Sequence, residues 1–190
     1  MEIAKLIEGI NIYLIGMMGT GKSTVGEVLA KELNYRFFDT DILIERVTKQ
    51  SINDIFKNQG ETAFRDIESQ VLSEVAACTR SVIATGGGII LKPQNWSYLH
   101  HGLIIWLDAS IELLVERLTE DNTRPLLQET DLTFKLQTLE KERRNLYQQA
   151  DLSIVIKKDQ TPENIVYQIL DQIPLVIKIK VETMKFDNKN

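Results

Sequence analysis

The chain has 190 residues, of which 43% are hydrophobic, and a net charge of −5, which predicts one domain with a single well-covered core. Acidic and basic residues are mixed along the sequence, which argues against nucleic acid as a partner, and no apolar run is long enough to cross a membrane. The lone cysteine, Cys78, excludes an internal disulfide framework, and residues 1–5 lack the layout of a signal peptide. We therefore expect a cytoplasmic protein.

Short apolar runs alternate along the chain with longer amphipathic runs. The apolar runs predict strands at residues 12–15, 36–39, 81–85, 103–107 and 152–156. The amphipathic runs predict helices at residues 22–34, 41–49, 61–79, 110–119, 132–149 and 161–173. Strands that alternate with helices favour an α/β fold in which a parallel sheet is covered on both faces.

The first strand is followed by residues 16–24, which read Gly-Met-Met-Gly-Thr-Gly-Lys-Ser-Thr and match the pattern G-x-x-x-x-G-K-S. Glycines let backbone N–H groups surround a phosphate, and the next helix adds the positive end of its dipole. Lys22 would then reach the β- and γ-phosphates, and Ser23 would bind the bridging Mg²⁺. The alternative is a Gly-rich turn that only links strand to helix, but the strand before and the helix after favour a nucleotide site. Its predicted ATP-binding residues are Gly19, Thr20, Gly21, Lys22, Ser23 and Thr24.

The second strand ends in Asp39-Thr40-Asp41. The carboxyl end of a strand is where open α/β sheets place their sites, so both carboxylates are candidates for one. Asp39 has a second interpretation, because an aspartate between a strand and a helix is a common N-cap. A later helix start is indicated by Ser51 and Asp54, which resemble a capping box.

Four further clusters follow in chain order. Residues 61–65 (Glu-Thr-Ala-Phe-Arg) open a helix, and residues 85–88 (Thr-Gly-Gly-Gly) end a strand. Residues 124–127 (Arg-Pro-Leu-Leu) lie in a polar stretch, and residues 143–147 (Arg-Arg-Asn-Leu-Tyr) lie on a helix. Taken singly, each arginine reads as a surface ion-pair partner and the glycines as a flexible turn.

Taken together and in this order, the motifs resemble the shikimate kinase family. The matches are the P-loop, the D-T-D after the second strand, the F-R-x-I-E helix, the G-G-G turn, the R-P-L-L lid and the R-x-x-x-Y helix, spanning residues 16–147. The resemblance implies a three-layer αβα P-loop NTPase fold with a five-stranded parallel sheet and a lid. It places the kinase domain at residues 1–175 and leaves 176–190 as a C-terminal extension of unknown role.

The resemblance also implies the reaction and the acceptor site. The reaction is Mg²⁺-dependent transfer of the ATP γ-phosphoryl group to the 3-hydroxyl of shikimate, a step on the route through chorismate to the aromatic amino acids. Arg65 and Arg143 would hold the shikimate carboxylate as guanidinium forks. Asp41 would orient the attacking hydroxyl, with a role as base left open. The predicted substrate site is completed by Gly86, Gly87 and Gly88, with Gly87 offering its N–H.

For the donor, the resemblance implies that Ser23 binds Mg²⁺ directly and Asp39 through water. Arg124 would close with the lid over ATP and bring its guanidinium to the phosphates. Arg117 and the loop before Pro162 correspond to the family's adenine-packing positions. The predicted catalytic residues are Lys22, Asp41 and Arg124. ATP and shikimate are the expected partners, and we expect a monomer.

Two rival functions and one open segment remain. A gluconate kinase shares the P-loop and the size but is not expected to carry the D-T-D, F-R and G-G-G set together. A catalytically silent relative that serves as a binding or regulatory module is disfavoured because Lys22, Asp41, Arg65 and Arg143 are all present. Residues 176–182 alternate apolar and charged side chains. This pattern leaves three interpretations of the segment: an edge strand, a contact with another subunit or a disordered segment.

Overall fold

The computed structural model describes residues 6–7, 9–120 and 131–187. Within these residues, one parallel sheet is formed by β1 (Ile12–Ile15), β2 (Arg36–Asp39), β3 (Ser81–Ala84), β4 (Leu103–Ala109) and β5 (Leu152–Ile156). The strand order is β2-β3-β1-β4-β5. The predicted α/β class with a five-stranded parallel sheet is confirmed.

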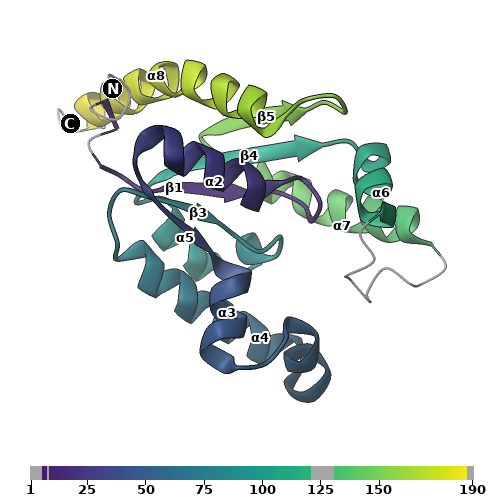
Figure 1. Cartoon of the computed structure of the whole chain (residues 1–190). Coiled ribbons are helices and arrows are strands. Elements are labelled where there is room, and N and C mark those ends of the chain that lie inside the picture. Colours follow the sequence, from purple (N-terminus) through teal and green to yellow (C-terminus); the bar gives the residue numbers. More distant parts are fainter. Residues whose placement is uncertain (1–5, 8, 121–130, 188–190) are drawn as a thin grey trace.

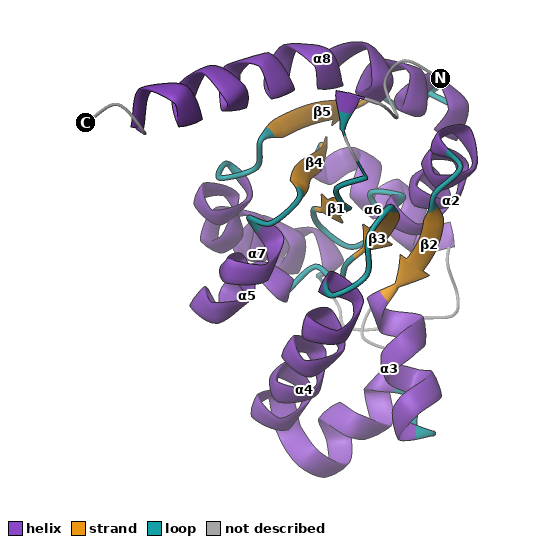
Figure 2. Ribbon diagram, turned by 90° about the vertical axis from the view of Figure 1, so that its left-hand side faces the viewer, coloured by secondary structure: helices purple, strands orange, loops and turns teal. Residues whose placement is uncertain are grey.

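Helices cover both faces of this sheet, as predicted. The described helices are α2 (Lys22–Leu33), α3 (Thr40–Thr48), α4 (Ile52–Ala76), α5 (Pro93–Leu99), α6 (Ile111–Glu120), α7 (Leu132–Tyr147) and α8 (Pro162–Asp187), with a short 3₁₀ helix η1 (Ile89–Leu91). Helices α2 and α8 lie side by side on one face, while α5 and α7 lie on the other (Figures 1 and 2). The result is the three-layer arrangement.

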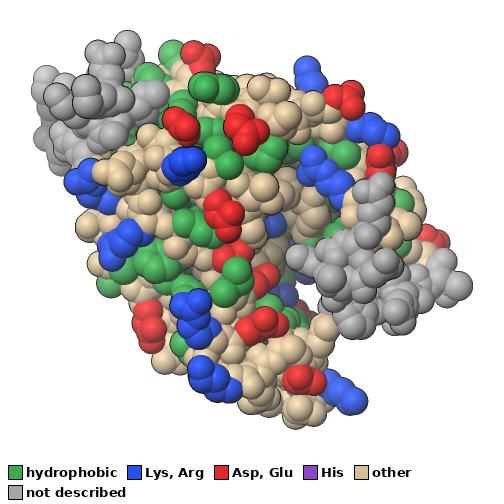
Figure 3. Space-filling model, viewed as in Figure 1, with side chains coloured by type: hydrophobic (Ala, Val, Ile, Leu, Met, Phe, Trp, Pro, Cys, Tyr) green, Lys and Arg blue, Asp and Glu red, His purple; other side chains and the backbone are tan. Residues whose placement is uncertain are grey.

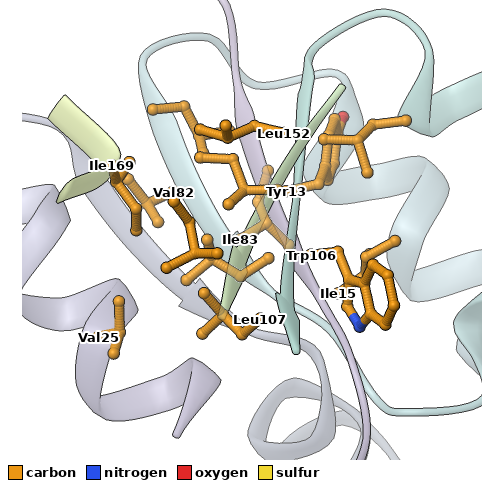
Figure 4. Packing of buried hydrophobic residues seen from close by; sticks show 14 of the residues in the cluster. Tyr13, Ile15, Val25, Val82, Ile83, Trp106, Leu107, Leu152 and Ile169 are labelled. Atoms are coloured by element: carbon orange, nitrogen blue, oxygen red, sulfur yellow. The ribbon is translucent and has the colours of Figure 1, made fainter. Parts of the chain in front are cut away.

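The core lies between these layers. Every residue of β1 and β3 is buried, because the central strands of a parallel sheet are covered on both sides. Figure 4 shows Val25 of α2 and Ile169 of α8 packing with strand residues such as Ile83 and Leu107. This rigid centre fixes the loops that leave the carboxyl ends of the strands.

Helices α3 and α4 extend beyond the sheet (Figure 1), and a smaller apolar cluster joins them. Ile44 of α3 packs there with Ile55 and Phe64 of α4. Helix α4 is kinked at Gly60, whose φ of 83° and ψ of 173° are not helical. The predicted start of a helix at Glu61 coincides with this kink, and the predicted cap at Ser51 begins the first part of α4, since Ser51 Oγ accepts from Asp54 N at 3.1 Å.

The strand order creates a crevice at the carboxyl edge of the sheet. The connection from β1 runs through α2 to β2 on one side, whereas the connection from β3 runs through α5 to β4 on the other. Neighbouring strands whose connections leave in opposite directions form a topological switch point, the usual ligand site of such sheets. The P-loop and the three-glycine turn flank this point.

Two elements differ from the sequence expectation. Helix α5 was not predicted, because its seven residues cover only two turns and give too short a periodic pattern. At the other end, α8 continues through Pro174 to Asp187, so residues 176–182 are helical and the edge-strand alternative is wrong. Extending an existing helix needs no new nucleation, which outweighs a short alternating pattern.

Within the described residues, we find no helix long and apolar enough to cross a membrane. Acidic and basic side chains are interspersed over the face in Figure 3, in agreement with the mixed charge pattern of the sequence.

Candidate active site

The loop between β1 and α2 forms one wall of the site. Gly16, Gly19 and Gly21 have φ values of 141°, 80° and 91°. A Cβ on Gly16 would lie 2.5 Å from the carbonyl oxygen of Leu107, so both its φ and its close approach to β4 require glycine. Gly21 is the N-cap of α2 and has no side chain to bond the first N–H groups of the helix. This helix start therefore suits an anion.

Lys22 is the first residue of α2, and its side chain turns back into the loop. Its Nζ donates to the carbonyl oxygens of Gly16 at 2.9 Å and Met17 at 2.8 Å, and to Thr20 Oγ1 at 3.5 Å. Lys22 also lines a cavity of about 360 Å³ together with Ser23 and other loop residues. An ammonium group at this place can bind phosphate oxygens through charge-assisted hydrogen bonds.

Ser23 and Asp39 meet where α2 faces the end of β2. Ser23 Oγ donates to Asp39 Oδ2 at 2.5 Å, while Asp39 Oδ1 accepts from the N–H groups of Asp41 at 2.9 Å and Ile42 at 3.2 Å. Asp39 is therefore the N-cap of α3. Because the cap uses mainly one oxygen, the other can take part in a metal site, and the two interpretations of Asp39 are compatible.

Asp41 lies in the first turn of α3, opposite the three-glycine turn that follows β3. A Cβ on Gly86 would lie 2.8 Å from Asp41 Oδ1 and 2.7 Å from Glu68 Oε1, so two carboxylates border this glycine. Gly86 N donates to Thr40 Oγ1 at 3.0 Å, which holds α3 against the turn. Asp41 and Gly87 line the same cavity as the P-loop. The structure thus brings the candidate acceptor residues next to the phosphate loop.

Arg65 is held on α4 by two acidic neighbours. Its Nε and Nη2 donate to Glu61 Oε1 at 3.3 and 3.1 Å, and its Nη1 donates to Glu68 Oε2 at 2.8 Å. Burial lowers the pKa of Arg65, but Glu68 and Glu61 outweigh burial and leave this pKa raised. A guanidinium has five N–H donors, so two remain beyond these three bonds for a ligand carboxylate.

Glu68 belongs to the F-R-x-I-E motif, but no role was predicted for it from the sequence. The side chain is 1% exposed, and within the described residues its Oε1 meets no hydrogen-bond donor. Burial raises the pKa of Glu68, Arg65 opposes this rise, and Asp41 adds to it. The available signal was spacing, since Glu68 follows Arg65 by three residues on the same helix face.

Gly88 lets the guanidinium of Arg65 lie against the backbone of the turn. A Cβ at Gly88 would come within 2.2 Å of Arg65 Nη1 and 2.4 Å of Cζ and Nη2. Any side chain there would displace the guanidinium, which is already fixed by its two carboxylates. A merely flexible turn would not need this contact.

Helix α7 approaches the same turn from the other side. Arg143 Nη1 donates to the Gly87 carbonyl oxygen at 3.4 Å, and Tyr147 OH donates to the same oxygen at 2.6 Å. The Nε of Arg143 is buried and has no acceptor among the residues described. Tyr147 ends the R-x-x-x-Y motif, but its contact with Gly87 was not predicted.

A second cavity, of about 230 Å³, lies beside the P-loop and is lined by Arg117, Gln160, Pro162 and Ile165 together with loop residues. Arg117 Nη1 donates to the carbonyl oxygens of Gly19 at 3.2 Å and Thr20 at 3.3 Å. The two predicted adenine positions, Arg117 and Pro162, therefore lie together although they come from α6 and α8. Arg124, the predicted lid residue, lies outside the described residues.

A phosphate loop that faces a carboxylate and two guanidinium groups across the switch point of a parallel sheet defines a P-loop kinase of small molecules. The sequence model of the family described as Shikimate kinase matches residues 18–174. The chain is 72% identical over 187 residues to the shikimate kinase of Rippkaea orientalis, covering 98% of this chain and 100% of that relative. It is 58% identical over 172 residues to that of Microcystis aeruginosa, covering 90% of each. The chain belongs to the shikimate kinase family.

Solved structures agree with this assignment. A shikimate kinase from Acinetobacter baumannii, solved in complex with shikimate, is 38% identical with a TM-score of 0.81 and covers 91% of this chain and 97% of its own. A gluconokinase from Sinorhizobium meliloti is 20% identical with a TM-score of 0.55, covering 94% and 97%. The second likeness concerns the fold alone, so it adds nothing to the gluconate kinase alternative.

Proposed function

We propose that this chain transfers the γ-phosphoryl group of ATP to the 3-hydroxyl of shikimate, giving shikimate 3-phosphate and ADP. The observation that carries the proposal is the juxtaposition of the P-loop, Asp41 and the guanidinium groups of Arg65 and Arg143 around one glycine turn. Shikimate has one carboxylate and three hydroxyls. It therefore needs guanidinium forks for the anion and an acceptor oxygen for the reacting hydroxyl.

At the donor end, the amides of the P-loop and Lys22 bind the β- and γ-phosphates of ATP. Adenine lies in the second cavity against Arg117 and the loop before Pro162. Arg124 brings its guanidinium to the transferring phosphoryl group when the lid closes, and closure excludes the water that would otherwise hydrolyse ATP.

Ser23 would hold Mg²⁺ directly and Asp39 would hold it through water, together with phosphate oxygens of ATP. Their hydroxyl and carboxylate oxygens are the hard donors that this ion prefers, and both residues line the same cavity, where Ser23 Oγ donates to Asp39 Oδ2 at 2.5 Å. No group of three or more His, Cys, Asp or Glu in the described residues could hold a metal. When bound, the ion would supply charge neutralisation at the transferring phosphoryl group.

At the acceptor end, Arg65 and Arg143 hold the carboxylate, and the turn of Gly86, Gly87 and Gly88 supports the ring. Asp41 accepts a hydrogen bond from the 3-hydroxyl and directs its oxygen at the γ-phosphorus. As the new P–O bond forms, the bond to the ADP oxygen breaks and the hydroxyl proton leaves toward Asp41. Because the transition state of phosphoryl transfer is loose, orientation contributes more than proton removal.

The monomeric state and the cytoplasmic location stay predictions from the sequence. The test of the function is ADP release with Mg·ATP, comparing shikimate with gluconate, a nucleoside monophosphate and no acceptor. We expect stimulation by shikimate alone, with shikimate 3-phosphate as product. ATP binding without shikimate turnover would instead favour the silent binding module.

A further inference from the structure

The three-glycine turn lies beside the phosphate loop at Gly87, which lines the same cavity as Met18. A Cβ on Gly87 would lie 3.4 Å from the carbonyl oxygen of Gly16, 3.5 Å from the Met18 nitrogen and 3.7 Å from Tyr147 OH. These are ordinary van der Waals distances for the added Cβ, so the turn and the start of the P-loop lie next to each other with room for one methyl group between them.

The orientation of the peptide after Gly87 is set from α7. Tyr147 OH lies 2.6 Å from the Gly87 oxygen and 3.8 Å from the sulfur of Met17. A hydroxyl has one proton, and the shorter contact to the stronger acceptor takes it. Because the peptide unit is planar and trans, fixing the Gly87 carbonyl also fixes the direction of the Gly88 N–H. Tyr147 thus touches both the acceptor turn and the nucleotide loop.

Tyr147 is itself held in place by the sheet. Its ring stacks on Trp106 of β4 with centroids 5.8 Å apart and an interplanar angle of 17°. Arg144 lies over the same indole at 5.1 Å and pairs with Asp108 of β4 at 3.1 Å. Trp106 in turn lies beside Gly16, where a Cβ would be 3.4 Å from Trp106 Cδ1. A phenol fixed in this way cannot follow small movements of the turn.

We propose that Tyr147 is a positioning residue that couples the two substrate sites, so that ATP in the P-loop and shikimate on the glycine turn each raise the affinity for the other. This inference rests on the proposed function. Its physical basis is that one hydroxyl contacts both the carbonyl oxygen of Gly87 in the turn and the sulfur of Met17 in the phosphate loop. Without that bond, the Gly87 carbonyl has to be placed by Arg143 alone, from 3.4 Å.

The hydroxyl stays a donor throughout the working pH range. Burial raises the pKa of Tyr147 to about 12, although Arg143 lowers it. The coupling is therefore expected to be independent of pH between 6 and 9 as far as Tyr147 is concerned.

The test is Tyr147→Phe, which removes the hydroxyl and keeps the ring that stacks on Trp106. Calorimetry gives the shikimate Kd of the full chain with and without a non-hydrolysable ATP analogue and Mg²⁺, and the ratio of the two is the coupling factor. In the wild type we expect a factor well above one. In the variant we expect it to fall by about fivefold, the equivalent of one net hydrogen bond, and the KM for shikimate to rise more than kcat falls.

Tyr13→Phe is the matched control, because Tyr13 is also a fully buried tyrosine of the sheet but lies near Gly102 at the opposite end of the strands. It should change the melting temperature without changing the coupling factor. An unchanged coupling factor in Tyr147→Phe, or a factor of one in the wild type, overturns the inference. Wild-type turnover of shikimate is measured first, so failure of the proposed function is seen separately.

Discussion

Replacing Glu68 by Gln tests whether burial or the pairing with Arg65 dominates the contribution of this carboxylate to folding stability. Glu68 is 1% exposed, and its raised pKa means that the folded chain accommodates the charged form less well than water does. Glutamine has nearly the same shape and keeps an oxygen that can accept from Arg65 Nη1. The substitution therefore removes the charge and leaves the packing.

The sign of the effect follows from linkage. The pKa of Glu68 is higher in the folded chain than in the unfolded chain. The contribution of Glu68 to the folding stability of the wild type is therefore fully present below the unfolded pKa of about 4.5 and is lost as pH rises through the folded pKa. Glutamine does not titrate. The melting temperature of Glu68→Gln should therefore be close to that of the wild type at pH 4 and exceed it at pH 8. Each unit of pKa shift corresponds to about 1.4 kcal/mol, or about 3–6 °C for a chain of this size.

Shikimate binding should become weaker in Glu68→Gln, although the folding stability of the variant is expected to increase at pH 8. The charge-assisted bond from Arg65 to Glu68 becomes a neutral one, so the guanidinium is less firmly held for the shikimate carboxylate. A loss of about 1 kcal/mol corresponds to a roughly fivefold rise in the KM for shikimate, with the KM for ATP unchanged. A variant that is more stable but binds its acceptor more weakly would identify Glu68 as a group kept for the site.

The assay is thermal unfolding of both proteins from pH 4 to pH 8, followed by steady-state kinetics at neutral pH. Glu61→Gln is the control, because Glu61 pairs with the same arginine but is 63% exposed, so its replacement should change the melting temperature little. If the difference for Glu68→Gln instead turns against the variant as pH rises, pairing with Arg65 outweighs burial. The reasoning about Glu68 would then be wrong.

Further substitutions test the acceptor site. Asp41→Asn should keep nucleotide affinity while turnover collapses, measured by calorimetry and ADP release; unchanged turnover would remove Asp41 from the mechanism. Lysine at Arg65 or Arg143 should raise the KM for shikimate by about 10- to 100-fold, since a point charge cannot replace a bidentate fork, and an equal rise for ATP would contradict that assignment. Gly88→Ala should weaken the binding of shikimate, because the added Cβ would overlap the Arg65 guanidinium. An unaltered KM for shikimate would show that the arginine acts from another position.

The strands were predictable because their signal is local. Central strands of a parallel sheet are buried on both faces, so β1 and β3 appear as continuous apolar runs bounded by polar residues. Helix α5 could not be predicted in this way, because its local signal is weak. Its two buried apolar residues, Trp96 and Leu99, are spaced by one turn in a segment of seven, which is too short to distinguish a helix from a loop.

For the site, too, the features that depend on adjacent residues could be predicted and those that depend on distant segments could not. The P-loop could be predicted in detail because its function depends on residues adjacent in sequence. The contacts of Gly86 with Thr40 and of Gly88 with Arg65 join segments far apart in sequence, and no local pattern specifies them. Resemblance supplied the residues of the acceptor site, but it did not supply what holds them. Glu68 and Tyr147 were inside the quoted motifs and still had no role until their contacts were known.

These contacts give a physical reason for glycine at positions 86 and 88 of the turn. Gly86 is bordered by the carboxylates of Asp41 and Glu68, Gly87 by the P-loop and Tyr147, and Gly88 by the guanidinium of Arg65. A Cβ on Gly86 or Gly88 would occupy space that a side chain of α3 or α4 fills, whereas a Cβ on Gly87 would fit at ordinary van der Waals distances beside the P-loop and Tyr147. The turn therefore acts as the common surface on which the nucleotide loop and the acceptor residues are positioned relative to one another. Gly86→Ala should therefore disturb Asp41 and Glu68, Gly88→Ala should disturb Arg65, and Gly87→Ala should disturb the turn least of the three.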